Sequence, residues 1–411
     1  ASAKKGKAGN WLLDPLDITI VENAGGNAAN ETDENGEKIF SPGSATNSQV
    51  SNTSINSELN NGTSVTVLTN STSAGANQAG NITVNADINK TGGADATLTL
   101  KADGNITVNK NITSTAGKLN VNLAAANTSS TGTITLGNNV NITTNGGDIT
   151  AGTANASNSV TIYVTGTNTV LNTTGTSNGN QAGNITLNGS RVEVKNANIT
   201  AGNFTLNGTS NGAALINVTL NTTRDINLTA TNVDRSSVHI KDASLTSTGG
   251  AIRVNGTATG SGTATHLDGN VTLNATNGSI ELNGKGVSAN AIDMRCNITL
   301  KAGNNINLTG NSTNGSAFYL GGNNNTLTAT GGSINLNGTS VETTAVDIRG
   351  NGTFTAGNIN LTGNSTNRTG LQLNDNTTLN ATNGSISLTG NSTNGTGLQL
   401  NGTNTLNATN G

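Results

Sequence analysis

The 411-residue sequence is poor in the side chains from which compact cores and catalytic sites are usually built. It contains one cysteine, one tryptophan, two histidines and two prolines, and aromatic residues make up 2% of it. A conventional globular core is hard to build from so few large apolar side chains. The single cysteine excludes an internal disulfide framework. No nucleophile triad, phosphate-binding loop or zinc-ligand spacing is found, so we expect no enzyme, cofactor or metal site.

Charge of either sign is also scarce, because charged residues are 10% of the chain and the net charge is −3. Lysine and arginine are scattered rather than clustered, which argues against nucleic acid or an anionic membrane as a partner. No run of about 18 apolar residues is present, so direct membrane insertion is not expected. The chain starts at Ala1 without a hydrophobic signal segment and stops at Gly411 within a repeat. We expect a processed chain or a piece of a longer one.

What the sequence does have is an apolar pattern that repeats about every 27 residues in its second half. Three positions in each repeat are apolar, and each position forms a series. The first series is Ile226, Ile252, Ile280, Ile306, Ile334, Ile359 and Ile386; the second is Ile240, Leu267, Met294, Leu320, Ile348, Leu373 and Leu400; the third is Leu245, Leu273, Leu300, Leu327, Phe354, Leu379 and Leu406. Three apolar positions indicate three short segments, so each repeat should form three walls.

Each segment alternates apolar and polar residues, as in residues 306–308, which is typical of a β-strand. Pairs such as Asn277-Gly278 lie between segments and turn the chain sharply, since both residues reach positive φ cheaply. No stretch has a sustained 3.6-residue period, so no helix is expected. These features predict an all-β, right-handed parallel β-helix with about three strands per coil and coils of roughly 20–28 residues. Disorder is the alternative for so polar a chain, and the shared register of three series argues against it.

The chain divides into four zones. Residues 1–22 are a lead-in in which Trp11, Leu13 and Ile18 should cap the first coil, and the acidic residues 23–64 should form a flexible excursion. Residues 65–225 should form less regular coils, followed by regular coils over residues 226–411. The inward candidates of the less regular zone are Ile82, Ile106, Ile134, Ile162, Ile185 and Phe204, and their spacing leaves the register of these coils open. Alternation beside Met294 also predicts that Cys296 is a buried thiol.

Asparagine forms Asn-x-Ser/Thr triplets about forty times, roughly twice what its abundance would give by chance. Two explanations compete. A strand with isoleucine inward has this pattern by itself, and stacked amides form hydrogen-bonded ladders along parallel coils. Alternatively the triplets are glycosylation sites with patchy occupancy, because sugars are too wide for every coil. The candidate sites are Asn81, Asn105, Asn111, Asn141, Asn184, Asn198, Asn217, Asn270, Asn297, Asn311, Asn364 and Asn391.

A second set of outward residues departs from the asparagine and threonine background, beside the second apolar series. These candidate ligand-binding residues are His239, Lys241, His266, Asp268, Asp293, Arg295, Tyr319, Asp347 and Arg349. A planar phenol, arginine forks and carboxylates suit a sugar or its carboxylate. The competing interpretation is a solvated charge ladder, since Lys241, Asp268 and Arg295 alternate in sign on successive coils.

Residues 10–15 (Asn-Trp-Leu-Leu-Asp-Pro) precede a β segment, a Ser/Asn/Gly-rich excursion and Asn-Ile-Thr coils. This arrangement resembles the Haemophilus high-molecular-weight adhesins, within the wider filamentous haemagglutinin class. The resemblance implies export by two-partner secretion through an outer-membrane transporter and a β-helix displayed at the cell surface. It also implies binding to host-cell glycans or glycoproteins, and hexoses added to asparagine by a cytoplasmic N-glycosyltransferase. The secretion domain and the carboxy-terminal anchoring region of that family are not in this sequence.

We therefore expect a segment of a secreted adhesin fibre. A passive stalk that displays a binding region elsewhere is the alternative. A polysaccharide lyase is a remote one, because lyases also use β-helices but concentrate more carboxylates in a groove walled by long loops. An ice-binding β-helix is equally remote, since the threonine columns are single and interrupted by asparagine.

Overall fold

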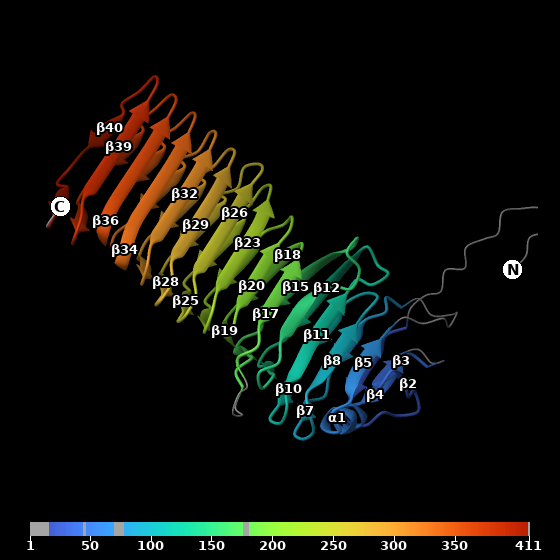
Figure 1. Ribbon diagram of the computed structural model, residues 1–411. Helices are drawn as coiled ribbons and strands as arrows, with labels where there is room; N and C mark the ends of the chain where they lie inside the picture. Colours follow the sequence, from blue (N-terminus) through green and yellow to red (C-terminus); the bar gives the residue numbers. More distant parts are fainter. Residues whose placement is uncertain (1–15, 44–46, 70–77, 176–180, 410–411) are drawn as a thin grey trace, which may run out of the picture.

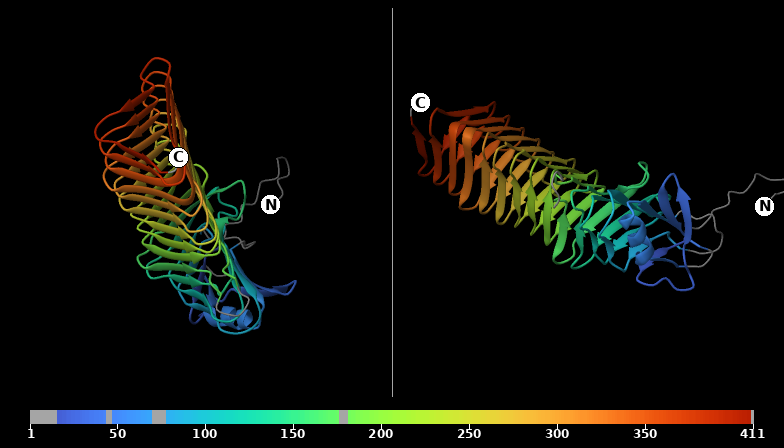
Figure 2. Two further views of the ribbon diagram at one scale, coloured as in Figure 1. Left: turned by 60° about the vertical axis from the view of Figure 1, so that its left-hand side comes forward. Right: turned by 60° about the horizontal axis from the view of Figure 1, so that its bottom comes forward.

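The computed structural model describes residues 16–43, 47–69, 78–175 and 181–409. It is nearly all β, with 57% of residues in strands and 2% in a helix, and its parallel coils stack into a β-solenoid of about 14 turns. Figures 1 and 2 show a single rod in which the coils of the described residues stack one on another, with the amino-terminal strands at one end and β39 and β40 at the other. The predicted all-β solenoid is thereby confirmed.

The first wall is a 15-stranded sheet to which successive coils contribute one strand each. Its strands, in spatial order, are β4 (Ser48–Ser51), β1 (Ile18–Val21), β6 (Ile82–Val84), β9 (Ile106–Val108), β12 (Thr131–Leu136), β15 (Ser159–Val164), β18 (Arg191–Lys195), β21 (Ala213–Ile216), β24 (Val238–Lys241), β27 (Thr265–Asp268), β30 (Ile292–Arg295), β33 (Phe318–Gly321), β35 (Val346–Ile348), β37 (Leu371–Leu373) and β40 (Leu398–Leu400). Because every pair is parallel, equivalent residues of successive coils lie side by side.

The second wall follows the first along each coil. Its strands are β7 (Ile88–Lys90), β10 (Ile112–Ser114), β13 (Asn141–Thr143), β16 (Thr169–Asn172), β19 (Ala197–Ala201), β22 (Thr219–Thr222), β25 (Ser244–Ser247), β28 (Val271–Ala275), β31 (Ile298–Ala302), the first parts of β34 (Asn325–Ser340) and β36 (Gly352–Ser365), β38 (Thr377–Ala381) and β41 (Thr405–Ala408). The long strands β34 and β36 continue around the corner into the third wall, so the second and third walls form one bent sheet.

The third wall completes each coil. Its strands are β5 (Ser64–Leu68), β8 (Ala96–Lys101), β11 (Leu119–Ala125), β14 (Ile149–Thr153), β17 (Ile185–Gly189), β20 (Phe204–Gly208), β23 (Ile226–Asn232), β26 (Ile252–Ala258), β29 (Ile280–Gly286), β32 (Ile306–Ser312), the second parts of β34 and β36, and β39 (Ile386–Ser392). Three walls agree with the three predicted segments of each repeat.

All three predicted apolar series are continuous columns, one on the inner face of each wall. The Ile226 series lies in the third wall, the Ile240 series in the first and the Leu245 series in the second. Most of these side chains are fully buried. Burying each one stabilises the coil by about 1.5–3 kcal/mol, which explains why their register is kept.

In residues 65–225 all six inward candidates are buried, as predicted, and they belong to two walls. Ile82, Ile106, Ile134 and Ile162 form a column in the first wall. Ile185 and Phe204 instead pair in the third wall. Strands of all three walls share one alternating pattern, so sequence spacing alone does not show where a series passes from one wall to another.

The corner between the first and second walls has a positive φ in eleven successive coils. The residues there are Asn139, Asn168, Asn196, Asn217, Asp242, Gly269, Cys296, Gly322, Gly350, Asp375 and Gly402. Asparagine, aspartate and glycine tolerate this conformation best, which accounts for ten of the eleven. Cys296 is the exception, with φ of 64°. The predicted burial of its thiol is wrong, because the strand ends at Arg295 and the turn exposes Cys296.

The amino-terminal segment predicted as a flexible excursion contains regular structure. The antiparallel pair β2 (Asn30–Glu34) and β3 (Glu37–Ser41) joins the stack through β5, and helix α1 (Asn52–Asn60) follows β4. This helix was not expected, because nine residues are too few for a sustained period. It buries Ile55 and Leu59, four residues apart on one face.

The motif at residues 11–15 lies outside the described residues, and so do Trp11 and Leu13 of the expected cap. Ile18 is described: it is buried in β1, which pairs with both β4 and β6. No helix in the described ranges is long and apolar enough to cross a membrane.

Candidate functional site

The outer face of the first wall gathers all nine predicted ligand-binding residues. His239, His266, Asp293, Tyr319 and Asp347 occupy one column, which we call the middle column. Two positions along each strand, Lys241, Asp268 and Arg295 form a neighbouring column, and Arg349 follows Asp347 in the same way. The predicted placement is confirmed, while ligand binding by these residues stays a prediction.

Two carboxylates of the middle column lie beneath arginines of their own coils. Arg295 donates from Nε and Nη2 to the two oxygens of Asp293, at 2.8 Å each. Arg349 donates from Nε to Asp347 at 2.9 Å. Both aspartates are buried while more than half of each arginine side chain is exposed. The hydrogen bond from each arginine to its aspartate raises the pKa of that guanidinium, so both arginines are fixed, permanent cations.

Tyr319 lies between the two arginines. The guanidinium carbons of Arg295 and Arg349 are 5.6 and 5.9 Å from the centre of its ring. A Cβ atom on Gly321 would come within 2.7–2.8 Å of the Tyr319 ring and hydroxyl. Glycine at this position therefore lets the tyrosine extend along its own strand, which brings the phenol between two cations.

The predicted charge ladder exists for one step only. Lys241 Nζ lies 3.1 Å from Asp268 Oδ2 on the next coil. Burial would raise the pKa of Asp268, but the hydrogen bond and charge of Lys241 outweigh this and lower it. Arg295 does not continue the ladder, because its guanidinium turns to Asp293 in its own strand.

His239 and His266 stack on adjacent coils with ring centres 4.9 Å apart and planes 8° from parallel. Ser236 Oγ lies 3.4 Å from Nδ1 of His266. Among the described residues, Nε2 of each ring is buried without a hydrogen-bond partner. Burial lowers the pKa of both imidazoles, and for His239 the neighbouring His266 lowers it further. The pair is therefore neutral near pH 7.

The sequence prediction missed the upstream part of the same wall. Glu193 in β18 is buried between Arg191 and Lys195, which both form ion pairs with it. Burial would raise the pKa of Glu193, but hydrogen bonds from Lys195 and Arg191 outweigh this and lower it. On the next two coils, Ala214 and then His239 follow Glu193 in the middle column.

Because Ala214 is small, a hollow of about 290 Å³ opens between Glu193 and His239. Arg191, Lys195, Arg235 and Ser236 contribute to its lining. Three cations and one carboxylate give this hollow an excess of positive charge. The sequence signal was the triplet Arg-Val-Glu-Val-Lys at residues 191–195, but the register of this zone was not known from spacing alone.

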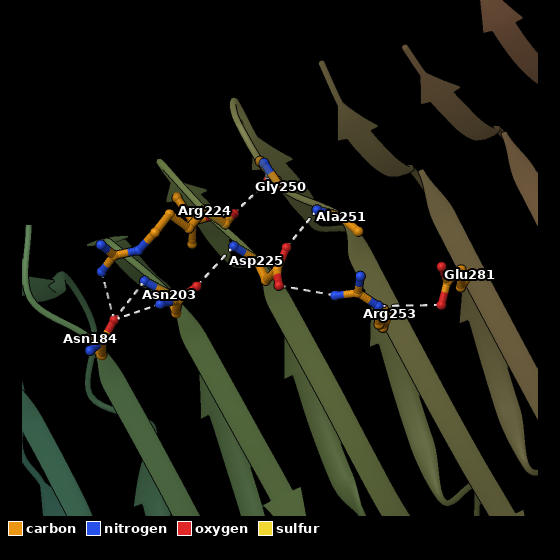
Figure 3. Close-up of polar contacts among 10 residues, drawn as sticks. Asn184, Asn203, Arg224, Asp225, Gly250, Ala251, Arg253 and Glu281 are labelled. Carbon is orange, nitrogen blue, oxygen red and sulfur yellow. Dashed lines mark hydrogen bonds and ion pairs between the residues drawn. The ribbon is translucent and has the colours of Figure 1, made fainter. Parts of the chain in front are cut away.

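Asparagine ladders are present in all three walls, as the structural explanation of the triplets predicted. Figure 3 shows one at the entry to the third wall: Asn203 N donates to Asn184 Oδ1, and Asp225 N donates to Asn203 Oδ1. The side-chain oxygen of each asparagine thus accepts a hydrogen bond from the backbone N–H group of the equivalent residue one coil on. Arg224 also donates to Asn184 at 2.9 Å. These contacts satisfy donors at the corner that would otherwise lack partners.

The twelve candidate glycosylation sites all lie on the outer surface, at least partly accessible. They differ in the state of the Nδ2 atom, to which a sugar would be attached. In Asn105, Asn217, Asn297 and Asn391 this atom donates to an asparagine of the preceding coil. In the other eight candidates Nδ2 has no donor contact among the described residues. Glycosylation therefore stays a prediction, and the geometry divides the candidates into two groups.

No three histidine, cysteine, aspartate or glutamate side chains of the described residues lie close enough together to hold a metal ion. A scan against models of protein families finds no match to the chain, and a search of curated proteins finds no significant match. The geometry of the walls is therefore the basis for a functional assignment.

Proposed function

We propose that this chain is a segment of a bacterial adhesin fibre, secreted to the cell surface, that attaches to host-cell glycans through the outer face of its first wall. The observation that carries the proposal is the arrangement of arginines above buried aspartates around Tyr319, repeated along a rigid in-register stack. A stack of this kind holds its outward groups at fixed spacings, and fixed groups bind with little loss of conformational entropy.

The chemistry of this face suits sugars. Guanidinium groups donate paired hydrogen bonds to carboxylates and hydroxyls, and the tyrosine hydroxyl both donates and accepts. The hollow beside Ala214 adds a recess with cations on its rim. Adhesive contact needs many weak, repeated sites, and a solenoid provides them along one wall.

The proposal includes the export and modification implied by the resemblance to high-molecular-weight adhesins. An outer-membrane two-partner secretion transporter would export the chain, and a cytoplasmic N-glycosyltransferase would add hexoses to accessible asparagines before export. The eight candidates with an unengaged Nδ2 atom are the preferred acceptors. Intact-mass measurement after co-expression with the transferase tests this part, because a mass that stays at 40.9 kDa contradicts it.

The decisive test of adhesion uses the intact chain immobilised on a glycan array and on epithelial cells. We expect retention of specific glycans by the parent chain and its loss in the Tyr319→Ala variant, which removes the phenol between the two arginines. Arg253→Gln, on the third wall, is the matched control and should bind as the parent does. Absence of binding by properly glycosylated parent chain would contradict the proposal.

A passive stalk is the second candidate, and one observation favours it. Lys195, Lys241, Arg295 and Arg349 each already have a carboxylate partner, so these four cations are paired without a ligand. A stalk would show the same rigid rod with no glycan retention in that experiment.

A further inference from the structure

The regular coils have a second period that is twice the length of the first. Segments 225–241, 279–295 and 333–349 are 54 residues apart, which is two coils, and they share an exposed valine (Val233, Val287 and Val341) where the coils between them have Thr259 and Thr313. Each of these segments ends in a basic residue: Lys241, Arg295 and Arg349. The coils between them place Asp268 and Gly321 at the corresponding position. Cations therefore occur on alternate coils of the first wall.

The alternation extends upstream by one further step. Lys195 pairs with Ile216, and Ile216 pairs with Lys241, so Lys195 lies two coils before Lys241. Four alternate-coil cations result, namely Lys195, Lys241, Arg295 and Arg349. Since coils are about 4.8 Å apart, the backbone positions of neighbouring cations are about 9.6 Å apart and the four positions span about 29 Å along the rod.

Each alternate-coil cation lies above a carboxylate that is less exposed than itself. The exposed fractions of the side chains are 37% for Lys195 above 7% for Glu193, and 42% for Lys241 beside 28% for Asp268. They are 55% for Arg295 above 3% for Asp293, and 56% for Arg349 above 4% for Asp347. The acids hold the cations in place while the cations form the outer surface. A partner therefore meets a row of positive groups that recurs on alternate coils, in which the Lys241 ammonium is drawn toward Asp268 on the next coil.

We propose that the alternate-coil cations bind a linear polysaccharide that lies parallel to the rod and carries one carboxylate on every second sugar. An extended disaccharide spans much the same length as two coils, so successive carboxylates would meet successive cations. This inference rests on the proposed adhesive function and names the ligand class of the first wall.

The groups between the cations favour this partner over a densely charged one. Ile216 and the Tyr319 hydroxyl, which lies over Gly321, carry no charge and suit a neutral sugar. Asp268 would repel a second anionic group in the gap that it occupies. A polymer with several sulfates on each disaccharide would therefore place anionic groups opposite the uncharged gaps and Asp268. A neutral polymer would offer no anionic group to the cations.

The free donors point the same way. Arg295 and Arg349 use Nε and Nη2 for their aspartates, and Nη1 of each has no partner among the described residues. A carboxylate at that edge would accept a charge-assisted hydrogen bond. The hollow lined by Arg191, Lys195 and Arg235 lies at the upstream end of the row and can accept the end of such a polymer.

The test measures the affinity of the intact chain for oligosaccharides that alternate glucuronate with N-acetylglucosamine, from four to ten sugars. We expect affinity to rise with each added disaccharide and to level off at about eight sugars, when all four cations are engaged. Neutral N-acetylglucosamine oligomers of equal length should not bind, and heavily sulfated oligomers should bind no more tightly than the alternating ones. Affinity independent of length, or a clear preference for the sulfated oligomers, would overturn the inference.

Variants locate the site. Arg295→Gln with Arg349→Gln should weaken binding of the eight-sugar ligand by at least about tenfold, since two charge-assisted contacts are lost. Arg253→Gln removes an equally charged arginine from the third wall and should leave affinity within about twofold. Should the double variant fold poorly, Lys195→Gln with Lys241→Gln tests the other half of the row on two exposed side chains. Equal effects of first-wall and third-wall variants would contradict the proposed row.

The outcomes separate the two proposals. If the chain retains cells or other glycans on an array but none of the alternating oligosaccharides, the ligand assignment fails and the adhesive function stands. If it retains nothing, both fail.

Discussion

The first and third walls handle charge in opposite ways. On the third wall Arg253 bridges Asp225 at 3.0 Å and Glu281 at 3.3 Å, and the three side chains are exposed to a similar degree, 35–38% (Figure 3). On the first wall Asp293 and Asp347 are almost fully covered by their arginines. The third-wall network ties three successive coils together. The Asp293–Arg295 and Asp347–Arg349 pairs each stay within one coil and orient a cation outward.

The charged residues of the third wall therefore connect coils, whereas the two arginine–aspartate pairs of the first wall present cations outward. Both walls bury isoleucine, leucine and valine inward, and these residues set the register. An exposed bridge between coils contributes little to stability and offers no fixed group to a partner. A cation held by a buried carboxylate is preorganised, which is the property that a binding surface requires. The outward residues, not the core, therefore distinguish the walls.

The largest expected difference in stability is between an inward and an outward substitution in the same strand. Ile334→Ala should lower the free energy of unfolding by about 2–5 kcal/mol, because it opens a cavity between Ile306 and Ile359. Asn335→Ala, one residue on, removes amide contacts to Asn307 and Asn360 and should cost about 1 kcal/mol. Urea unfolding of both variants measures the two losses in the free energy of unfolding. Equal costs would mean that the inward columns do not govern stability.

A smaller effect should separate the acids of the two walls. Asp293→Asn weakens a buried charge-assisted pair and should cost about 1–2 kcal/mol, since Arg295 can turn to water. Asp225→Asn keeps the side-chain oxygen that accepts the N–H group of Ala251, and loses only an exposed ion pair. Its expected cost is below about 1 kcal/mol. Thermal unfolding compares them, and a larger loss for Asp225→Asn would reverse the assigned roles.

Acidification should weaken the first wall through its histidines. The pKa values of His239 and His266 are lowered in the folded chain from the ordinary 6.5. The unfolded chain therefore binds protons first as the pH falls below about 6.5, and the free energy of unfolding decreases. Asp268 and Glu193 have lowered pKa values and add a separate loss only at more acidic pH. His239→Gln with His266→Gln should remove the change between pH 7 and pH 5; the same change in this variant would assign it elsewhere.

The smallest effect should be a gain at the corner. Asparagine tolerates positive φ and already occupies the equivalent corner position at Asn196 and Asn217. Cys296→Asn should therefore stabilise the chain by about 0.5 kcal/mol. Cys296→Ala keeps the unfavourable conformation and serves as the control. Urea midpoints report both, and a gain for alanine equal to that for asparagine would point to the thiol rather than to φ.

The sequence predicted the solenoid and its regular half because the core is a set of identical columns. One apolar position in each strand, repeated seven times, fixes wall number and register together. The same spacing placed His239 through Arg349 correctly on one face. Outside this half the coil length varies, from 36 residues between Ile149 and Ile185 to 19 between Ile185 and Phe204, so spacing does not show that Ile162 and Ile185 lie in different walls.

Three other features were not predicted correctly from the sequence, each for a local reason. The helix at residues 52–60 depends on packing of Ile55 and Leu59 against the stack, which a nine-residue pattern does not reveal. Cys296 followed strand alternation in the sequence, whereas the corner imposes its own conformation. Glu193 and the hollow beside Ala214 depend on which residues of three consecutive coils meet, so they needed the register first.

The most direct test of the stacked, outward-facing row is a set of distances between spin labels. The native cysteine is first removed by Cys296→Asn. One labelled pair is then introduced by Lys241→Cys with Arg349→Cys, four coils apart, and a second by Lys195→Cys with Arg349→Cys, six coils apart. We predict distances near 19 and 29 Å, each narrowly distributed, since every coil adds about 4.8 Å. Broad distributions, or distances that do not grow in proportion to the number of coils, would contradict the account.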